Sequence, residues 1–572
     1  MTRKPFAALA LAIAALLMTT SATAAGVSAN TKVTGYQSMG VKHMRTTVLA
    51  NGVQISLAAV KNAEGLWHLA EFTSTNASTE EHTADATNFT DISDIQLLKL
   101  KNGTLLAVYS GYTVSGTTAT SHLFASTSTS GTTWTTPVRV VADRTDNATT
   151  FPANIAGGFP TFRAVQDSQG QLGVFVLVSN GVGVTLGQSI STDGSSWKYG
   201  TTLSSPATWP TKFRMLQVVA SAKDVKVFWQ STDPAGDARM NYRTAADLNS
   251  SWSTVAQVAP SATHPTEYSF GANARGDIAV AYRNMGSASF SLKRLAAGTN
   301  VWSNPTALNF GANRTNTLRL SINSRLEVGA LALTTDSDFN NNIEAIQTTS
   351  TGTLANRKVI EEVAAINGLV FFVNMDDYGR WNILYDSNQE DALEVDNQIY
   401  VTSSLAERHG TLNALSAPAL LTPDTEVVRA AAITIDAKLN LYIFYSHYTD
   451  IAASAGAARL IQTIAPSITG KATLRPTASA IAQRTNLTIT VPRATGGEPA
   501  ITTTKIQWYR CKAKVTRTAT KVPTGCSAIT GATKTSYRTS ALDKGKYVLA
   551  AVTLSHPAVS VTQTTISSGK GK

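Results

Sequence analysis

Short runs of alternating apolar and polar residues dominate the chain between about residue 90 and residue 465. In the clearest run, from Asp94 to Tyr109, two such stretches flank Asn102-Gly103, a dipeptide typical of tight β-hairpins. Helical periodicity is scarce, so the pattern predicts an all-β protein. The order of apolar strand, turn and second apolar strand recurs in seven units, which open near Asp94, Thr161, Phe213, Tyr268, Leu318, Phe371 and Val428.

Four tryptophans mark the same repeat. Trp134, Trp197, Trp252 and Trp302 each follow small turn-forming residues and precede a short strand-like run, at intervals of 63, 55 and 50 residues. Short strands repeating at this spacing predict a β-propeller. The length fits about seven blades and allows six to eight. Residues 25–89 hold further strand-like runs that either close the ring or form an additional blade.

The first 24 residues have the pattern of a secretory signal peptide. Arg3 and Lys4 precede an apolar run from Phe6 to Met18, and Ala22-Thr23-Ala24 resembles a cleavage site. No later stretch approaches the ~20 apolar residues of a membrane-spanning helix. We therefore expect a secreted or cell-surface protein without a membrane span.

Charge divides the chain into two parts. From Pro466 onward there are 16 lysines and arginines against two acidic residues, Glu498 and Asp543, which gives this segment a net charge of +14. Residues 25–465 carry about −5, because the whole chain is +11 and the signal contributes +2. The basic segment predicts an anionic partner, and export favours a cell-wall polymer over nucleic acid. The competing interpretation is that the charge serves solubility alone.

Residues 467–572 resemble a bacterial immunoglobulin-like module. The stretch from Ile506 to Cys511 and the stretch from Cys526 onward carry the resemblance. An immunoglobulin-like sandwich would place Trp508 in its core, and we expect the two cysteines of the chain to pair in an exported protein.

The tryptophan hairpins resemble the Asp-boxes of sialidase-type (BNR repeat) propellers. The segment 127–134 has the form of the box with Thr129 in place of its aspartate, and 191–197 is a shorter version that keeps Asp193. In that family the box is a structural turn. The resemblance thus implies a sialidase-like β-propeller over residues 90–465, with the tryptophans as packing residues.

The same resemblance implies a catalytic site that this chain reproduces only in part. Sialidases open their first blade with an Arg-Ile-Pro motif, but the corresponding residues here run from Ser93 to Gln96 and lack the arginine and the proline. Four arginines near the starts of predicted inner strands are candidates for binding an acidic ligand, although their offsets from the following turns differ: Arg163, Arg214, Arg319 and Arg429. Ordinary strand-end arginines near solvent are the alternative.

Two further groups of residues carry candidate chemistry. Tyr242 with Glu267 is the one pair resembling a sialidase nucleophile, whose tyrosine would avoid repulsion from an anionic sugar. Oxygen-bearing side chains alternate in the segment 336–344, a pattern able to wrap Ca²⁺, or else the polar tip of a hairpin. The calcium candidates are Asp336, Asp338, Asn340 and Glu344. We expect no other cofactor.

The missing motif and the charge division favour binding over hydrolysis. We expect a secreted or cell-surface adhesion protein whose propeller recognises a glycan or protein ligand and whose basic module associates with the cell envelope. A diverged sialidase-like glycoside hydrolase and a structural surface-layer component are the alternatives.

Overall fold

A computed structural model gives the fold of most of the chain. The described residues are 27–32, 40–75, 79–147, 159, 161–179, 184–204, 215–232, 238–259, 265–284, 286–287, 289–310, 314–337, 340–363, 371–377, 380–387, 398–403, 415, 418–420, 427–436, 440–449, 452–460, 467–495, 503–556 and 559–572. The predicted signal peptide lies outside them. Two compact units are present: the first comprises Met1–Asp436 and Leu441–Ile461, and the second comprises Ala437–Asn440 and Gln462–Lys572.

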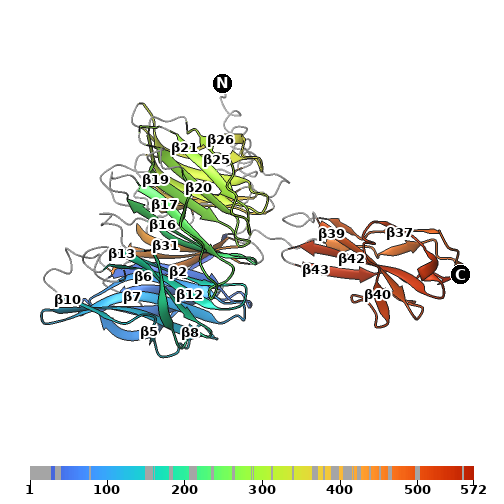
Figure 1. Ribbon diagram of the computed structural model, residues 1–572, viewed down its shortest axis with the longest axis horizontal. Coiled ribbons are helices and arrows are strands. Elements are labelled where there is room, and N and C mark those ends of the chain that lie inside the picture. The colour runs from blue at the N-terminus through green and yellow to red at the C-terminus, as the bar shows by residue number, and fades with distance from the viewer. Residues whose placement is uncertain are drawn as a thin grey trace, which may run out of the picture. The chain divides into compact units, whose positions relative to one another are not determined.

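The first unit is built from antiparallel sheets that follow one another along the chain (Figure 1). Eight such sheets occur within its described residues. The first sheet contains β2 (Gly40–Val48), β3 (Gln54–Lys61), β4 (Trp67–Ser74) and β5 (Thr79–Phe89), and the second contains β6 (Asp91–Lys99), β7 (Leu105–Ser115), β8 (Thr118–Ser128), β9 (Val138–Arg139) and β10 (Arg144–Asn147). The third sheet contains β11 (Phe162–Gln166), β12 (Leu172–Ser179), β13 (Val184–Ser191) and β14 (Lys198–Ser204). The fourth sheet contains β15 (Leu216–Ala220), β16 (Val225–Thr232), β17 (Ala238–Ala245) and β18 (Ala256–Gln257).

The remaining sheets of the first unit complete the series. They are β19 (Pro265–Ala272), β20 (Ile278–Asn284), β21 (Phe290–Leu295) and β22 (Thr306–Leu308); β23 (Arg314–Ile322), β24 (Val328–Thr335), β25 (Asn341–Thr348) and β26 (Leu354–Val363); β27 (Phe371–Met375), β28 (Trp381–Ser387), β29 (Gln398–Ser403) and β30 (Ala419–Leu420); and β31 (Val427–Ile435), β32 (Leu441–Thr449) and β33 (Ala452–Leu460) with β1 (Val27–Lys32).

Packing between the sheets closes them into a ring. A cluster of buried apolar side chains lies between each sheet and the next; between the second and third sheets, for example, it joins Leu106 and Val108 to Phe162 and Val174. A further cluster joins the last sheet to the first and includes Phe444, whose ring centroid lies 4.9 Å from that of Phe72. Because every sheet buries both faces against its neighbours, the unit is a β-propeller of eight blades.

The predicted propeller is therefore confirmed, with eight blades where seven repeat units were expected. All seven units coincide with blades that begin at or near β6, β11, β15, β19, β23, β27 and β31. The eighth blade comes from β2 to β5, in the region where the sequence left ring closure and an additional blade open. Both occur, because β1 also pairs with β33 and supplies the outermost strand of the last blade.

Each of the four marker tryptophans occupies the same place in its blade. Trp134, Trp197, Trp252 and Trp302 lie in the connection from the third strand to the outer strand of four successive blades. In two of these turns a serine hydroxyl accepts a hydrogen bond at 2.8 Å from a glycine N–H, that of Gly131 or Gly194. Both glycines have positive φ, so the turns require the conformational freedom of glycine.

Side-chain contacts explain the tryptophan and aspartate of these turns. Asp193 Oδ1 accepts a hydrogen bond from the backbone N–H of Ser195 at 2.8 Å, and the indole N–H of Trp197 donates to Gly194 at 3.1 Å. The indole of Trp252 packs edge-on against Phe175 with ring centroids 5.5 Å apart. These residues stabilise hairpins and blade contacts.

The second unit consists of three small sheets within residues 467–495, 503–556 and 559–572. Its strands are β34 (Ser467–Thr469), β35 (Thr473–Arg475), β36 (Ala480–Ile481), β37 (Asn486–Thr490), β38 (Arg493–Thr495), β39 (Thr503–Cys511), β40 (Cys526–Ala528), β41 (Ser536–Arg538), β42 (Tyr547–His556), β43 (Val559–Thr564) and β44 (Lys570–Gly571), with a 3₁₀ turn η5 (Ala541–Asp543). Trp508 is fully buried, as predicted, and its indole N–H donates to Lys534 at 2.8 Å. The predicted Cys511–Cys526 disulfide is formed and joins β39 to β40. Among the described residues of the chain, no helix is long and apolar enough to cross a membrane.

Candidate functional site

The first strands of the blades lie around the propeller axis. β2 contacts both β6 and β31, β6 also contacts β11, and β23 contacts both β19 and β27. Side chains from the starts of these strands can therefore meet although they are far apart in the sequence. Binding sites commonly form where polar groups from several elements converge in this way.

Three charged side chains from neighbouring first strands form one cluster. The guanidinium of Arg45 on β2 donates from Nη2 to Asp94 Oδ1 on β6 at 2.7 Å. The guanidinium of Arg163 on β11 lies with Nη1 at 3.2 Å from the other oxygen, Oδ2, of the same carboxylate. A single carboxylate is thus shared by two arginines, and the cluster keeps a net charge of +1.

The arginines of this cluster are held in place but are not enclosed. Arg45 Nη1 donates to the Met44 carbonyl and Arg163 Nη1 donates to the Phe162 carbonyl, both at 2.7 Å. The side chains of Arg45 and Arg163 remain 40% and 28% exposed, against 15% for Asp94. Because each guanidinium has five N–H donors, both keep donors for a ligand.

Backbone irregularities set the direction of two of these side chains. The pairing of β2 with β3 shifts register between Lys42 and Arg45, and the pairing of β6 with β7 shifts between Ile92 and Asp94. His43 lies in the first shift and has φ of 52°, in the left-handed region that is uncommon for a non-glycine residue. Bulges of this kind redirect side chains and are enriched next to functional sites.

A second ion pair and a neutral histidine flank the cluster. Lys42, three residues before Arg45, forms an ion pair with Asp91 on β6, and its ammonium lies 4.3 Å from the ring centroid of Trp67. Burial, together with the Lys42 ammonium, lowers the pKa of His43, so that this imidazole is neutral at neutral pH. The ion pairs Lys42–Asp91 and Arg45–Asp94 both join the first two blades.

Arg45, Arg163 and Arg319 are equivalent in their blades. A backbone hydrogen bond marks the start of the turn after each first strand. Its donor is the N–H of Leu49 in the first blade, of Asp167 in the third and of Asn323 in the sixth. Each arginine lies four residues before that position. The expectation of unequal offsets was therefore wrong for Arg163 and Arg319, although the structure brings Arg163, and not Arg319, to Asp94.

The other arginine candidates do not join the cluster in the described part of the chain. Arg319 on β23 is exposed and donates to the neighbouring Leu318 carbonyl at 3.4 Å. Arg429 lies on β31 at a register shift, with its side chain outside the described residues, and Arg214 is wholly outside them.

The candidate nucleophile pair is not assembled. Tyr242 on β17 is 7% exposed, and its ring stacks on Phe228 with centroids 5.4 Å apart, inside an apolar cluster. Glu267 on β19 instead pairs with Arg283, at 2.6 Å. Within the described residues no hydrogen bond links Tyr242 to Glu267. Their separate partners indicate packing for the tyrosine and an ion pair for the glutamate.

The calcium candidates also have separate roles. Asp336 accepts hydrogen bonds from the backbone N–H of Asn340 at 2.9 Å and from its side-chain amide at 3.3 Å, which closes the hairpin between β24 and β25. Glu344 is buried and pairs with Arg357 at 2.8 Å. Asp338 lies outside the described residues, among which no group of three or more metal-ligating side chains occurs.

A hollow of about 580 Å³ lies between the third and fourth blades. It is lined by Lys198 and Arg243 and by the Trp252 hairpin, and the Nε atom of Arg243 is buried without a hydrogen-bond partner among the described residues. Trp252 donates from its indole nitrogen to Gln188 at 3.0 Å, which makes one wall polar and fixed.

The arginine cluster at Asp94 has the geometry to bind a second carboxylate. Two guanidinium groups that meet on one anion can bind another by bidentate hydrogen bonds, because both are planar and permanently charged. Arg163 was predicted from the sequence, whereas Arg45 was missed. The available signal was its position before Asn51-Gly52, the same dipeptide that follows Asp94 in the next blade.

Comparisons with known proteins do not identify a family. No family model matches the chain, and no curated protein matches it significantly. Among solved structures, a protein of unknown function from Dyadobacter fermentans is 11% identical, with 77% of this chain and 100% of that chain covered and a TM-score of 0.34.

Two enzymes are among the similar structures. The NanB sialidase from Streptococcus pneumoniae is 11% identical, with 75% of this chain and 70% of that chain covered and a TM-score of 0.31. The alpha-L-arabinofuranosidase of Fusarium graminearum is 15% identical, with 56% and 98% covered and a TM-score of 0.34. Likenesses at this level do not define the architecture of this chain, which rests on its own sheet topology.

Proposed function

We propose that the propeller is a binding module for a carboxylate-bearing glycan. The observation that carries this proposal is the convergence of Arg45 and Arg163 on Asp94, with guanidinium groups still exposed and a net positive charge. A ligand carboxylate would replace solvent at the free donors and gain charge-assisted hydrogen bonds. The separation of Tyr242 from Glu267 supports binding over hydrolysis.

Titration of the full chain with acidic and neutral sugars tests the binding half. We expect N-acetylneuraminic acid or galacturonic acid to bind and galactose not to bind. Arg45→Ala and Arg163→Ala should each weaken binding by about ten- to a hundredfold, because a hydrogen bond to a charged group contributes about 1.5–3 kcal/mol. Arg275→Ala is the matched control, since this arginine is 62% exposed and lies on a hairpin of another blade. Equal losses in all three variants would refute the site.

A glycoside hydrolase is the competing function, and it has a separate assay. A panel of fluorogenic sialosides and arabinosides should show no turnover with the full chain. Turnover that disappears in Arg163→Ala would establish catalysis at this cluster and overturn the binding proposal.

For the second unit we propose an immunoglobulin-like module that retains an exported protein on the anionic envelope. The charge of +14 supports this role, because screening of such a charge by salt predicts reversible attachment. Washing expressing cells with 1 M NaCl should release the protein, and removal of residues 1–24 from the precursor should be seen by N-terminal sequencing. A protein that stays attached in high salt is not held by charge.

A further inference from the structure

The positive charge of the second unit is almost entirely without acidic partners. All 16 lysines and arginines of residues 467–572 are described, and one ion pair forms among the described residues of this segment, between Arg510 Nε and Asp543 Oδ1 at 2.5 Å. The remaining described cations form no ion pair with a described acid of the unit. Folding of the unit therefore leaves them available to a partner.

The sheet β35–β37–β41 arranges some of these cations on one surface. Residues directly opposite each other on antiparallel strands share a face. Thr473 lies opposite Thr490 and Arg475 lies opposite Thr488 on β37, and β37 in turn pairs with β41. The hydroxyl–guanidinium face, as we call it, consists of Thr473, Arg475, Asn486, Thr488, Thr490, Ser536 and Arg538, all of them exposed.

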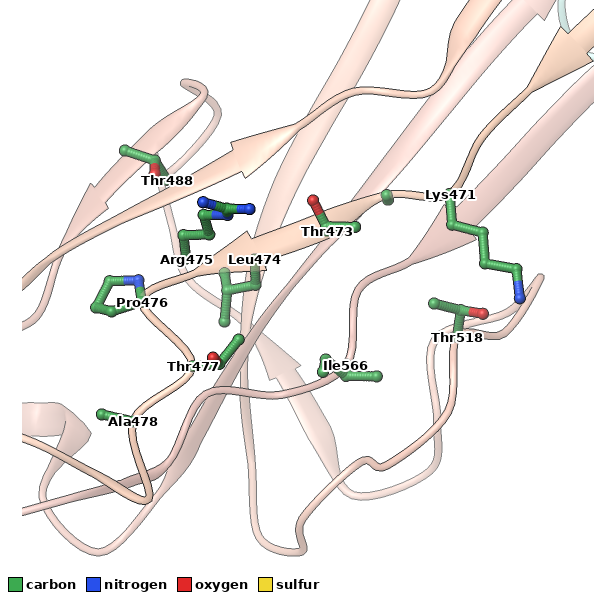
Figure 2. A pocket seen from close by; sticks show the side chains of 11 residues that line it. Lys471, Thr473, Leu474, Arg475, Pro476, Thr477, Ala478, Thr488, Thr518 and Ile566 are labelled. Atoms are coloured by element: carbon green, nitrogen blue, oxygen red, sulfur yellow. The ribbon is translucent and has the colours of Figure 1, made fainter.

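The side chains of this face have no hydrogen-bond partner among the described residues. The apolar residues that alternate with them, such as Leu474 and Leu487, point into the core of the unit. Figure 2 shows Thr473 and Arg475 on one side of the strand and Leu474 on the other. The face thus offers hydroxyl groups and cations and contains no carboxylate.

A hollow of about 950 Å³ adjoins the face (Figure 2). Lys471, just before β35, lines it together with Thr473, Arg475 and Thr518. Four residues of extended strand separate the backbone of Lys471 from that of Arg475 by about 13 Å, and two strand spacings separate β35 from β41 by about 10 Å. Cations at these separations suit a long anion with repeated charges better than a single small one.

The chemistry of the face favours a polysaccharide over a nucleic acid. Binding of single-stranded nucleic acid relies on aromatic side chains that stack on bases. The aromatic residue of β41, Tyr537, alternates to the opposite side, where its ring lies 5.5 Å from that of Trp508 and its hydroxyl donates to Asp543 at 2.8 Å. The threonine and serine hydroxyls instead match the hydroxyl groups of a sugar chain.

We propose that the hydroxyl–guanidinium face and its hollow bind a linear anionic polysaccharide. Lys471, Arg475 and Arg538 pair with its sulfate, phosphate or carboxylate groups, while the face hydroxyls form hydrogen bonds with the sugar. This inference rests on the envelope association proposed above and gives that association a specific site.

The test measures fluorescence anisotropy of labelled dextran sulfate with the full chain at 0.15 M salt, with neutral dextran as the blank. Replacing Lys471, Arg475 and Arg538 together by alanine should weaken binding at least about tenfold, because three charged contacts are lost. The matched control replaces Lys512, Lys514 and Lys521, three exposed lysines between β39 and β40, and removes the same charge. We expect it to change affinity by about twofold or less. Polygalacturonate and a phosphate-linked glycan polymer then show which anionic group is preferred.

Each other result has a definite meaning. Equal weakening in the two triple variants would overturn the face and leave diffuse electrostatic retention standing. Failure of the unaltered chain to bind any anionic polymer would overturn both the face and the envelope association. Tighter binding of an oligothymidylate than of dextran sulfate would overturn the polysaccharide assignment. Thermal unfolding verifies folding of the variants, and Lys471→Ala alone, outside the sheet, serves if the triple variant does not fold.

Discussion

The two units of this protein handle their charges in opposite ways. In the propeller, four of the described arginines pair with acids on other strands: Arg45 and Arg163 with Asp94, Arg283 with Glu267, and Arg357 with Glu344. In the second unit Arg510 alone has an acidic partner within the described residues. These pairs in the propeller are part of its structure, so an acidic ligand must compete with an internal carboxylate for the same arginines. The cations of the second unit are open to a partner without such competition.

The ion pair between Arg510 and Asp543 should have the largest effect on stability. Asp543 is 2% exposed and accepts hydrogen bonds from Arg510, from the Tyr537 hydroxyl and from the backbone N–H of Ser540. Asp543→Ala leaves the guanidinium partly buried without its carboxylate, which should lower the free energy of unfolding of this unit by about 3–5 kcal/mol. Urea denaturation measures the change. Lys512→Ala, an exposed control, should stay within about 0.5 kcal/mol, and an equally small effect of Asp543→Ala would contradict the prediction.

Glu71 is a buried acid of the propeller that has no cationic partner among the described residues. Glu71 on β4 is fully buried, and its Oε2 has no hydrogen-bond partner in the described structure. Burial raises its pKa from 4.5 to about 7, opposed by the hydrogen bond from Thr73. Because the folded protein then holds a proton that the unfolded chain releases, the free energy of unfolding should fall as the pH rises from about 4.5 to 7.

Glu71→Gln removes this titration from the propeller. We expect the variant to be about 2–3 kcal/mol more stable than the unaltered protein at pH 8 and about equally stable at pH 4. Thermal or urea unfolding across this range measures the difference, with Glu64→Gln as a control at an exposed position. A stability difference that does not change with pH would show that the pKa of Glu71 is the same in the folded and the unfolded protein.

The blades could be predicted from the sequence because their signals are local. Alternation around Asn102-Gly103 and the tryptophan hairpins depends on residues a few positions apart, and each marked a blade. The arginine cluster depends on bulges at His43 and before Asp94, which no nearby motif announces, and it joins three strands that are distant in the sequence. Tyr242 was assigned to a site because its residue type suits the chemistry, while the fold uses its ring for packing against Phe228.

Competition within the arginine cluster can be tested by removing its carboxylate. Asp94→Asn keeps the shape of the side chain but frees Arg45 and Arg163 from their shared anion. The free energy of unfolding should fall by about 1–2 kcal/mol, because charged hydrogen bonds across the first three blades are weakened. Affinity for an acidic sugar should rise in the same variant, measured by titration calorimetry. A fall in affinity would mean that Asp94 itself contacts the ligand or orients the arginines for it.

The unpaired cations of the second unit should have the smallest effect on stability. Replacing Lys471, Arg475 and Arg538 by alanine removes no ion pair, so the free energy of unfolding should change by no more than about 0.5 kcal/mol. Because the substitutions remove repulsion among like charges, we expect a small gain in the free energy of unfolding. This gain should be largest at low salt and should vanish near 0.5 M NaCl, where salt screens the repulsion. Thermal unfolding at 20 mM and 500 mM NaCl measures this. A loss of several kcal/mol at both salt concentrations would show that these side chains hold the unit together, and the contrast with the paired charges of the propeller would then disappear.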